Sequence, residues 1–439
     1  MRLSSSAALV LLVLAGLLVA PDAEAQRRFP HVLIISIDTL RADHLGSYGY
    51  ERPTSPHLDA LLARGVRFET MRVPEPLTAP SMVSLFTGLH PHEHGTSRNG
   101  LRMRPGLPSL SKTLARRGYR TAAFVGNWTL RDELSGLSEH FDDYQEVFTH
   151  KRWFGMFNSE ANGAHLTTTA ADWVDAHLDD DRAAYPFLVW AHYTEPHAPY
   201  VLQETVAARF GIDPKQGRRA PPIDRYDTEI AFVDEVVGRL LERVRARVPD
   251  EDLLIVFLAD HGESLGEHNY WGHGRHLYDV TLHVPAGVVW PRRVPANTVV
   301  TGRTSSLDLA PSVLALLGLP VPETFRGRDL SPMLRGDAPP IGDAARVTWH
   351  QAHRGAARGG SDGARRNGLL EIAQVGPDGK ETMRTRSGKR QFFALADDPD
   401  ERRSTVQRNS APSVALARWL LEVRRGLAAS DALPAPALG

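Results

Sequence analysis

The chain has 439 residues and contains no cysteine, which excludes disulfide bonds and thiolate metal ligands. A bound transition metal would have to be held by imidazole and oxygen groups, and the chain has 19 histidines. An excess of one charge is also lacking, because the formal net charge is only −1. This balance argues against a nucleic-acid-binding protein and against a polybasic protein of membrane surfaces.

Long apolar runs are absent after the first 25 residues. Residues 1–25 resemble a secretory signal peptide, with Arg2 at the start, an apolar run from Ala7 to Ala20, and the small-x-small pattern Ala23-Glu24-Ala25. The run is shorter than the ~20 residues that a spanning helix needs. We therefore predict a cleaved signal peptide, a mature chain without a stable membrane span, and a periplasmic or secreted location.

Several β-branched, apolar runs end abruptly at polar residues: His31 to Ile37 before Asp38, Phe187 to Ala191 before His192, and Leu253 to Leu258 shortly before Asp260. Continuous apolar runs of this length are typical of strands that are buried on both faces of a parallel sheet. Between two of these runs, Tyr226 to Val244 repeats apolar residues with helical spacing. We predict an α/β fold over residues 26–336, with a doubly wound, mostly parallel sheet flanked by helices.

Residues 337–439 show a different pattern. Short runs with turn residues between them predict an antiparallel meander: Leu369 to Val375, Lys380 to Arg386, and Gln391 to Ala396. A final helix from about Ala411 to Leu427 would pack on it. The Gly-, Arg- and Ala-rich stretch from His353 to Gly368 is interpreted as a solvated loop. We expect a small C-terminal α+β subdomain.

Polar residues at the strand ends could form a metal site. Ligands of doubly wound sheets bind beyond the carboxyl ends of the strands, so Asp38, Asp260 and His261 can converge near Thr78. One imidazole and a low ligand count favour one Zn²⁺ or Mn²⁺, with Ca²⁺ possible. Taken singly, these residues could also be an ordinary strand-end carboxylate, a turn before Gly262, and, for Thr78, a helix cap.

The stretches around these residues resemble the sulfatase family of the alkaline phosphatase superfamily, over nearly the whole mature chain. The matching motifs include Asp38-Thr39-Leu40-Arg41-Ala42-Asp43, Thr78-Ala79-Pro80-Ser81, His192-Tyr193-Thr194-Glu195-Pro196-His197, Asp260-His261-Gly262-Glu263, Gly272-His273-Gly274 and Val284-Pro285. Each motif alone is weak, but their combination is specific.

This resemblance implies roles for individual residues. Asp38, Thr78, Asp260 and His261 would be metal ligands, and Thr78 would occupy the position of the nucleophile. His197 and His273 would contact the transferred group or its leaving oxygen. Weaker candidates are His192, His276 and Arg41, and the sequence does not decide which of His268, His273 and His276 faces the site.

The chain also departs from the family pattern. Thr78 stands where sulfatases carry the Cys or Ser that becomes formylglycine, and a threonine cannot form this aldehyde because its hydroxyl carbon bears a methyl group. Thr39, Met82 and the segment Asn127-Trp128-Thr129 replace the usual second Asp, the Arg and the Lys-Trp-His segment. The set that remains resembles the single-metal site of lipoteichoic-acid synthases and phosphoethanolamine transferases, which form a phospho-threonine intermediate.

The sequence therefore predicts an exported, metal-dependent ester hydrolase that cleaves a phosphoester or phosphodiester through a covalent Thr78 intermediate. Alternatives within enzymes are a sulfuric ester hydrolase without formylglycine and a phosphotransferase of the phosphoethanolamine or glycerol-phosphate type. A third alternative is a silent relative that binds an anionic glycan. The expected partner is a small-molecule or glycan phosphate or sulfate ester, and no nucleic acid.

Overall fold

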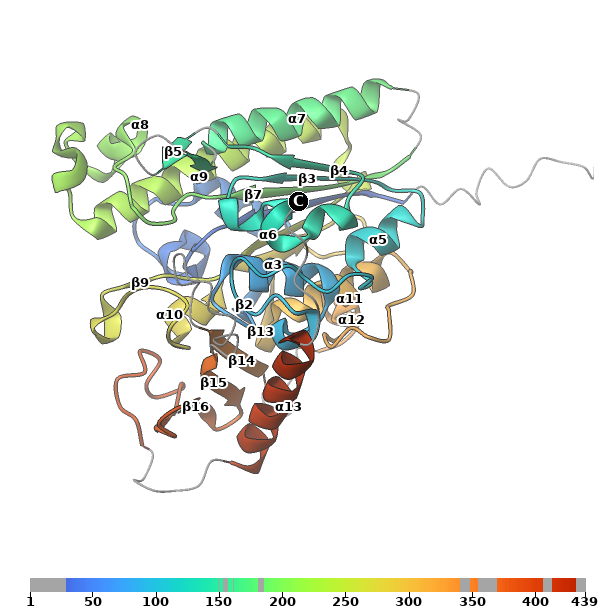
Figure 1. Ribbon diagram of the computed structural model, residues 1–439. Helices are drawn as coiled ribbons and strands as arrows, with labels where there is room; N and C mark the ends of the chain where they lie inside the picture. The colour runs from blue at the N-terminus through green and yellow to red at the C-terminus, as the bar shows by residue number, and fades with distance from the viewer. Residues whose placement is uncertain are drawn as a thin grey trace, which may run out of the picture.

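A computed structural model describes residues 29–148, 150–152, 157–160, 162–180, 185–339, 348–353, 369–405 and 413–431. Figure 1 shows a large sheet with helices on both sides and, below it, a smaller C-terminal sheet beside a long helix. The predicted signal peptide, most of the loop from His353 to Gly368 and the extreme C-terminus lie outside the described residues.

The large sheet has nine strands within the described residues, in the order β11-β2-β12-β8-β1-β7-β3-β4, with β13 also paired to β2. Five neighbouring strands from β8 to β4 are parallel, whereas β12 runs antiparallel to both β8 and β2. The strands are β1 (His31–Ile37), β2 (Val66–Arg72), β3 (Arg120–Val125), β4 (Asp143–Glu146), β7 (Phe187–Tyr193), β8 (Leu253–Ala259), β11 (His283–Val284), β12 (Ala286–Val289) and β13 (Thr298–Ser305).

Helices cover both faces of this sheet. On one face α7 (Gly163–Asp179) packs on α9 (Pro222–Arg247), and α9 in turn packs on α2 (Pro56–Ala63). On the other face α3 (Thr78–Thr87) contacts α5 (Leu110–Ala115) and α11 (Leu309–Leu316). Figure 1 shows α7 above β3, β4 and β7, and α5 and α11 below these three strands. The predicted α/β class with a mostly parallel sheet is confirmed.

The central strands are mostly apolar, and their few polar residues, His31, Ser36 and His192, are buried with them. All residues of β1, β7 and β8 are buried, as expected for strands covered by helices on both faces. The predicted strand β1 has the observed bounds, whereas β7 extends two residues beyond its apolar run, to Tyr193. The predicted helix from Tyr226 to Val244 lies inside α9, which begins at a proline in its first turn.

The C-terminal sheet is antiparallel, with the order β14-β15-β16-β17. Its strands are β14 (Thr348–His353), β15 (Leu369–Gly376), β16 (Gly379–Arg384) and β17 (Arg390–Phe393). Helix α13 (Val414–Asp431) packs on it, and Ile372, Leu416 and Trp419 belong to their shared core. The meander is confirmed, but the polar strand β14 was not foreseen. The described residues also include these short α-helices and strands: α4 (Pro91–His94), α6 (Asp132–Ser135), α8 (Glu204–Ala207), α10 (Asp279–Leu282), α12 (Ser331–Leu334), β5 (His150–Arg152), β6 (Phe157–Glu160), β9 (Ser264–Leu265) and β10 (Trp271–Gly272).

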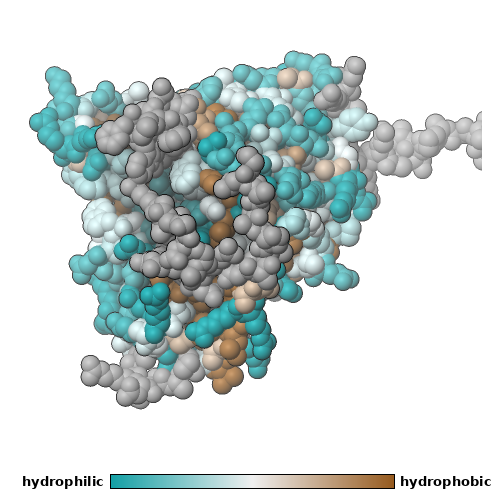
Figure 2. All heavy atoms as spheres, in the orientation of Figure 1, coloured by the Kyte–Doolittle hydropathy of each residue, from teal (hydrophilic) through white to brown (hydrophobic). Residues whose placement is uncertain are grey.

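The face seen in Figure 2 is largely hydrophilic, with a hydrophobic group over α13 near its lower edge. Two residues of α13 are exposed hydrophobics, Val414 and Leu421, at 77% and 53% exposure. Among the residues that the structure describes, no helix is both long enough and apolar enough to cross a bilayer.

Candidate active site

The two acidic residues of the candidate site follow two neighbouring strands. β1 and β8 are parallel and in register, with Ile37 opposite Ala259. Asp38 and Asp260 therefore leave the same edge of the sheet side by side, and both are fully buried. The turn after β1 is fixed to β8, because the backbone N–H of Thr39 donates to Asp260 Oδ1 at 3.0 Å.

His261 completes the cluster with a defined ring orientation. Its Nδ1 is 2.9 Å from the carbonyl oxygen of Gly262, so Nδ1 carries the proton and Nε2 is left as an acceptor. Nε2 lies 3.8 Å from Asp38 Oδ1 and 3.5 Å from Asp260 Oδ2. One ligand atom from each of these three residues lies within 4.8 Å of the other two.

Thr78 faces this cluster. Its Oγ1 lies 3.5 Å from His261 Nε2. Thr78 is the first residue of α3, whose cap residue is Leu77, and no side chain caps the helix. The helix-cap interpretation of Thr78 is therefore wrong. The hydroxyl is buried beside the start of a helix, where free backbone N–H groups favour an anionic ligand.

The electrostatics of the cluster suit a cation. Burial raises the pKa of Asp260 well above its ordinary value, and the neighbouring Asp38 charge raises it further. Burial also opposes ionisation of Asp38, but His197 and His192 hold the pKa of Asp38 below its ordinary value. For His261, burial lowers the pKa well below the ordinary value, so the imidazole is neutral. Without a bound cation, two adjacent buried carboxylates cannot both ionise.

The donor set fits a divalent metal. Within the described residues, Asp38 Oδ1 and Asp260 Oδ2 are buried without a hydrogen-bond partner. Buried carboxylate oxygens are normally paired or coordinate a metal. With Nε2 of His261, they offer one nitrogen and two oxygens within 4.8 Å of one another, and Thr78 Oγ1 can supply a third oxygen.

Two further histidines, His273 and His197, lie near the cluster. The ring of His273 is 4.2 Å from that of His261, and the ring of His197 is 5.5 Å from that of His273. His268 instead stacks on Tyr278 at 3.7 Å. His276 lies against the C-terminal sheet, with Nδ1 3.7 Å from Glu371 Oε2. His273 is therefore the one of these three histidines that contacts the cluster.

The weaker candidates lie around the cluster in different ways. His192 Nδ1 is 2.8 Å from Ser36 Oγ, and its Nε2 is 3.9 Å from Asp38 Oδ2. Asn127 donates from Nδ2 to the same Asp38 oxygen. From the sequence, Asn127 is recognised only as the replacement of a lysine. Its contact with Asp38 was not predictable, because β3 and β1 are not neighbours in the chain and meet only across β7.

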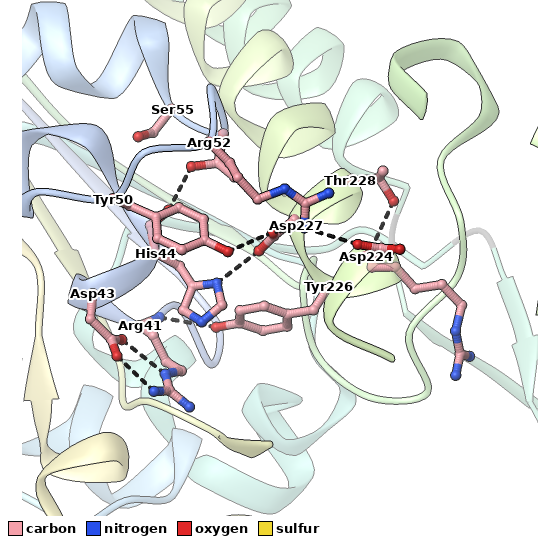
Figure 3. Close-up of polar contacts among 12 residues, drawn as sticks. Arg41, Asp43, His44, Tyr50, Arg52, Ser55, Asp224, Tyr226, Asp227 and Thr228 are labelled. Carbon is pink, nitrogen blue, oxygen red and sulfur yellow. Dashed lines mark hydrogen bonds and ion pairs between the residues drawn. The ribbon is translucent and has the colours of Figure 1, made fainter. Parts of the chain in front are cut away.

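Arg41 does not reach the cluster but supports the turn that carries Asp38. Its guanidinium pairs with Asp43 and Glu267, each at 2.7 Å. The Tyr226 hydroxyl bridges this turn, accepting from Arg41 N at 3.0 Å and donating to Thr39 O at 2.7 Å. Figure 3 shows Tyr226 reaching Arg41 from α9.

Comparison with known proteins agrees with this geometry. The family profile described as "Sulfatase" matches residues 30–319. Human arylsulfatase A is 28% identical over 378 residues, which covers 75% of this chain and 71% of that protein. An uncharacterized sulfatase, YidJ, of Escherichia coli is 26% identical over 357 residues, covering 69% of this chain and 70% of that protein.

Solved structures share the fold. A sulfatase-like structure from Bacteroides fragilis, described as putative sulfatase yidJ, has a TM-score of 0.71 at 18% identity and covers 95% of this chain and 100% of that chain. A phosphonate monoester hydrolase of Agrobacterium radiobacter has a TM-score of 0.67 at 20% identity, covering 91% and 96%. Fold and site thus define a hydrolase of sulfate or phosphate esters. The chain belongs to the sulfatase family.

Proposed function

We propose that this protein is a metal-dependent hydrolase of phosphoesters or phosphodiesters in which Thr78 is the covalent nucleophile. The observation that carries this proposal is the position of Thr78 Oγ1, 3.5 Å from His261 Nε2 at the start of α3. A bare hydroxyl in that place supports nucleophilic attack, and a threonine cannot form an aldehyde. Hydrolysis of a sulfate ester through formylglycine is therefore excluded for this chain as encoded.

We propose that Asp38, Asp260, His261 and Thr78 hold one divalent metal, with Zn²⁺ or Mn²⁺ favoured over Ca²⁺ because the set includes an imidazole. A bound cation would lower the pKa of the Thr78 hydroxyl and draw charge from the transferring group. The chain's own part is to hold Oγ1 in place and to keep the cluster away from bulk solvent. Asp38, Thr78, Asp260 and His261 are all at most 1% exposed.

In the proposed reaction, the Thr78 hydroxyl gives up its proton to water, and Oγ1 forms a bond to phosphorus while the bond from phosphorus to the leaving oxygen breaks. The leaving oxygen takes a proton from His273 or His197, acting as general acid. Water then attacks the phospho-threonine, and one proton of that water passes to Oγ1 as the bond from Oγ1 to phosphorus breaks. Support for His273 comes from its ring, which lies 4.2 Å from the His261 ring, and the ring of His197 lies 5.5 Å from that of His273.

The runner-up is a sulfuric ester hydrolase that works without the aldehyde. It is favoured by the family and by relatives described as sulfatases. Against it stand the neutral residues Met82 and Asn127 in place of two cations of the usual sulfate clamp, with Asn127 now engaged by Asp38. Transfer to an acceptor other than water would use the same first step.

Intact-mass and peptide analysis tests the proposal. Purified protein with Zn²⁺ or Mn²⁺ would be exposed briefly to an aryl phosphate, an aryl phosphodiester and an aryl sulfate, and then quenched in acid. We expect turnover of a phosphoester and a phosphate-sized adduct on the Thr78 peptide. Turnover of the sulfate alone would establish the runner-up. No turnover of any ester by metal-containing protein would favour a silent binding relative.

We further propose that the chain is exported after cleavage near residue 25, and that residues 26–336 form the catalytic domain with residues 337–439 as an appended subdomain. N-terminal sequencing of protein secreted by a bacterial host, with Gln26 as the expected first residue, tests the cleavage.

A further inference from the structure

The segment that precedes Thr78 is held in place by hydrogen bonds from other parts of the fold. Residues 73–77 connect β2 to α3, and all of them are buried. Their only backbone hydrogen bond to one another in the described structure joins Leu77 N to Glu75 O at 2.9 Å. Such a connection has little regular structure of its own, so its conformation depends on what packs against it.

Strand β14 of the C-terminal sheet supplies most of these contacts. His350 donates from Nδ1 to the Val73 carbonyl at 2.7 Å, and the backbone N–H of Gln351 donates to the Pro74 carbonyl at 2.9 Å. Both bonds go to backbone groups that no helix or strand would otherwise satisfy. β14 therefore acts on the segment as a neighbouring strand does, although it belongs to another sheet.

Glu75 joins the two parts by its side chain. Its Oε1 accepts from His353 Nδ1 at 2.8 Å, and its Oε2 accepts from Gln351 Nε2 at 3.2 Å. Gln351 is oriented in turn by His92, whose Nδ1 lies 3.0 Å from its Oε1. Glu75 is 0% exposed, so both carboxylate oxygens depend on these partners.

The opposite end of the segment is held by the active site itself. His273 donates from Nδ1 to the Pro76 carbonyl at 3.2 Å. Beyond Thr78, the Ala79 N–H donates to Asn99 Oδ1 at 3.0 Å. Residues 73, 74 and 75 are thus hydrogen-bonded to β14, and residue 76 is hydrogen-bonded to His273.

We propose that Glu75, together with Gln351 and His353, is a positioning residue for Thr78, so that the C-terminal sheet sets the place of the nucleophilic hydroxyl. This inference rests on the proposed role of Thr78. A displacement of roughly 1 Å at a reacting group can cost about 100-fold in rate, so a loosened segment would slow the covalent step while the substrate still binds.

The test compares Glu75→Ala and Glu75→Gln with Leu427→Ala as a matched control. Leu427 is buried in the core shared by α13 and the C-terminal sheet and is not bonded to residues 73–78, so its truncation weakens the same subdomain without touching the segment. Two quantities are measured in the metal-loaded full chain: kcat and KM with the aryl phosphoester, and hydrogen exchange of the peptide that spans residues 73–82.

We expect Glu75→Ala to lower kcat at least tenfold with KM within threefold and to speed amide exchange in the 73–82 peptide. Glu75→Gln, which keeps the shape and one acceptor, should recover part of kcat, and Leu427→Ala should lower the melting temperature but keep kcat. Unchanged exchange in Glu75→Ala would overturn the positioning role, as would faster exchange with an unchanged kcat. If Glu75→Ala does not fold, the same criteria apply to Glu75→Gln. If the wild-type chain turns over no ester, the proposed function fails, whereas the exchange result still decides whether Glu75 holds the segment.

Discussion

The Nε2 atom of His261 lies 3.5 Å from the hydroxyl oxygen of Thr78. The other ring nitrogen of His261 is bound to the Gly262 carbonyl, so this imidazole presents an acceptor and not a proton to Thr78. Both residues are buried, and carboxylate oxygens of Asp38 and Asp260 lie 3.8 and 3.5 Å from the same nitrogen. This relationship makes Thr78 and His261 parts of one polar centre.

Substitutions of Thr78 distinguish a catalytic role of its hydroxyl from a packing role of its side chain. Thr78→Ala removes the hydroxyl, and we expect kcat/KM for a phosphoester to fall by roughly 10³-fold or more, as for loss of a covalent nucleophile. Thr78→Ser keeps the hydroxyl and should stay within about tenfold. Steady-state kinetics and the mass of the acid-quenched Thr78 peptide measure both. Turnover by Thr78→Ala near the wild-type rate would contradict the proposed mechanism.

Removing a carboxylate ligand should lower the affinity for the metal. Asp260→Asn keeps the oxygen that accepts from Thr39 N and His261 N but loses the ligand charge. We expect its affinity for Zn²⁺ or Mn²⁺ to fall by more than the roughly 10- to 100-fold loss typical of a group that only supports a ligand. Elemental analysis after dialysis and metal titration followed by melting temperature measure this.

The control for this experiment is Asp250→Asn, because Asp250 precedes β8, at the opposite end of the strand from Asp260, and pairs with Arg245 at 3.0 Å. In the wild-type chain, metal at 100 times its Kd should stabilise the folded state by about 2.7 kcal/mol. An equal gain in Asp260→Asn would show that the metal binds elsewhere.

The sequence predicted the central sheet well because its strands are apolar on both faces. The continuous runs at β1, β7 and β8 leave little choice between strand and helix at that length, and their polar ends mark one edge of the sheet. Strand β14 was missed because its residues Thr348 to His353 are mostly polar. Its burial depends on partners such as Glu75 and Val73, which lie far away in the chain.

The candidate site was predictable only in part. Asp38, Asp260 and His261 stand directly at strand ends, so their convergence follows from parallel pairing. The choice of His273 over His268 and His276 could not be made from spacing, because the loop turns sharply, with Gly272 and Gly274 at φ 102° and 83°. The contact of Asn127 with Asp38 likewise depends on the order of strands in the folded sheet.

Removing the cation of a buried charge network should strongly destabilise the protein. Lys380 is 0% exposed, and its Nζ lies 2.9 Å from Glu401 Oε1 and 3.1 Å from Asp279 Oδ1. Lys380→Met would leave these two carboxylates with one cation fewer, so we expect a loss of about 3–5 kcal/mol in the free energy of unfolding. Urea denaturation measures it.

Arg326→Met is the matched control for Lys380→Met. Arg326 pairs with Glu93 at 2.7 Å, but its side chain is 56% exposed, so its loss should cost no more than about 1 kcal/mol. Equal losses in the free energy of unfolding in the two variants would contradict the expectation that burial determines how strongly the loss of an ion pair destabilises the protein.

The acid stability of the protein should depend on His350, the residue of β14 that binds the Val73 carbonyl. Burial, with Lys380 and Arg72 nearby, lowers the pKa of His350 to about 3 from the usual 6.5. Between these two values the unfolded chain binds a proton that the folded chain does not, so the free energy of unfolding falls as the pH falls. The contribution is fully present above pH 6.5 and decreases by up to about 1.4 kcal/mol per pH unit below it.

His350→Asn keeps an N–H donor but cannot titrate. We expect the stability difference between wild type and His350→Asn, measured by urea denaturation from pH 7.5 to pH 4.5, to shrink steadily below pH 6.5. Other buried histidines, such as His94, are present in both chains and cancel in this difference. Parallel pH profiles for the two chains would show that His350 keeps its proton-binding behaviour on folding.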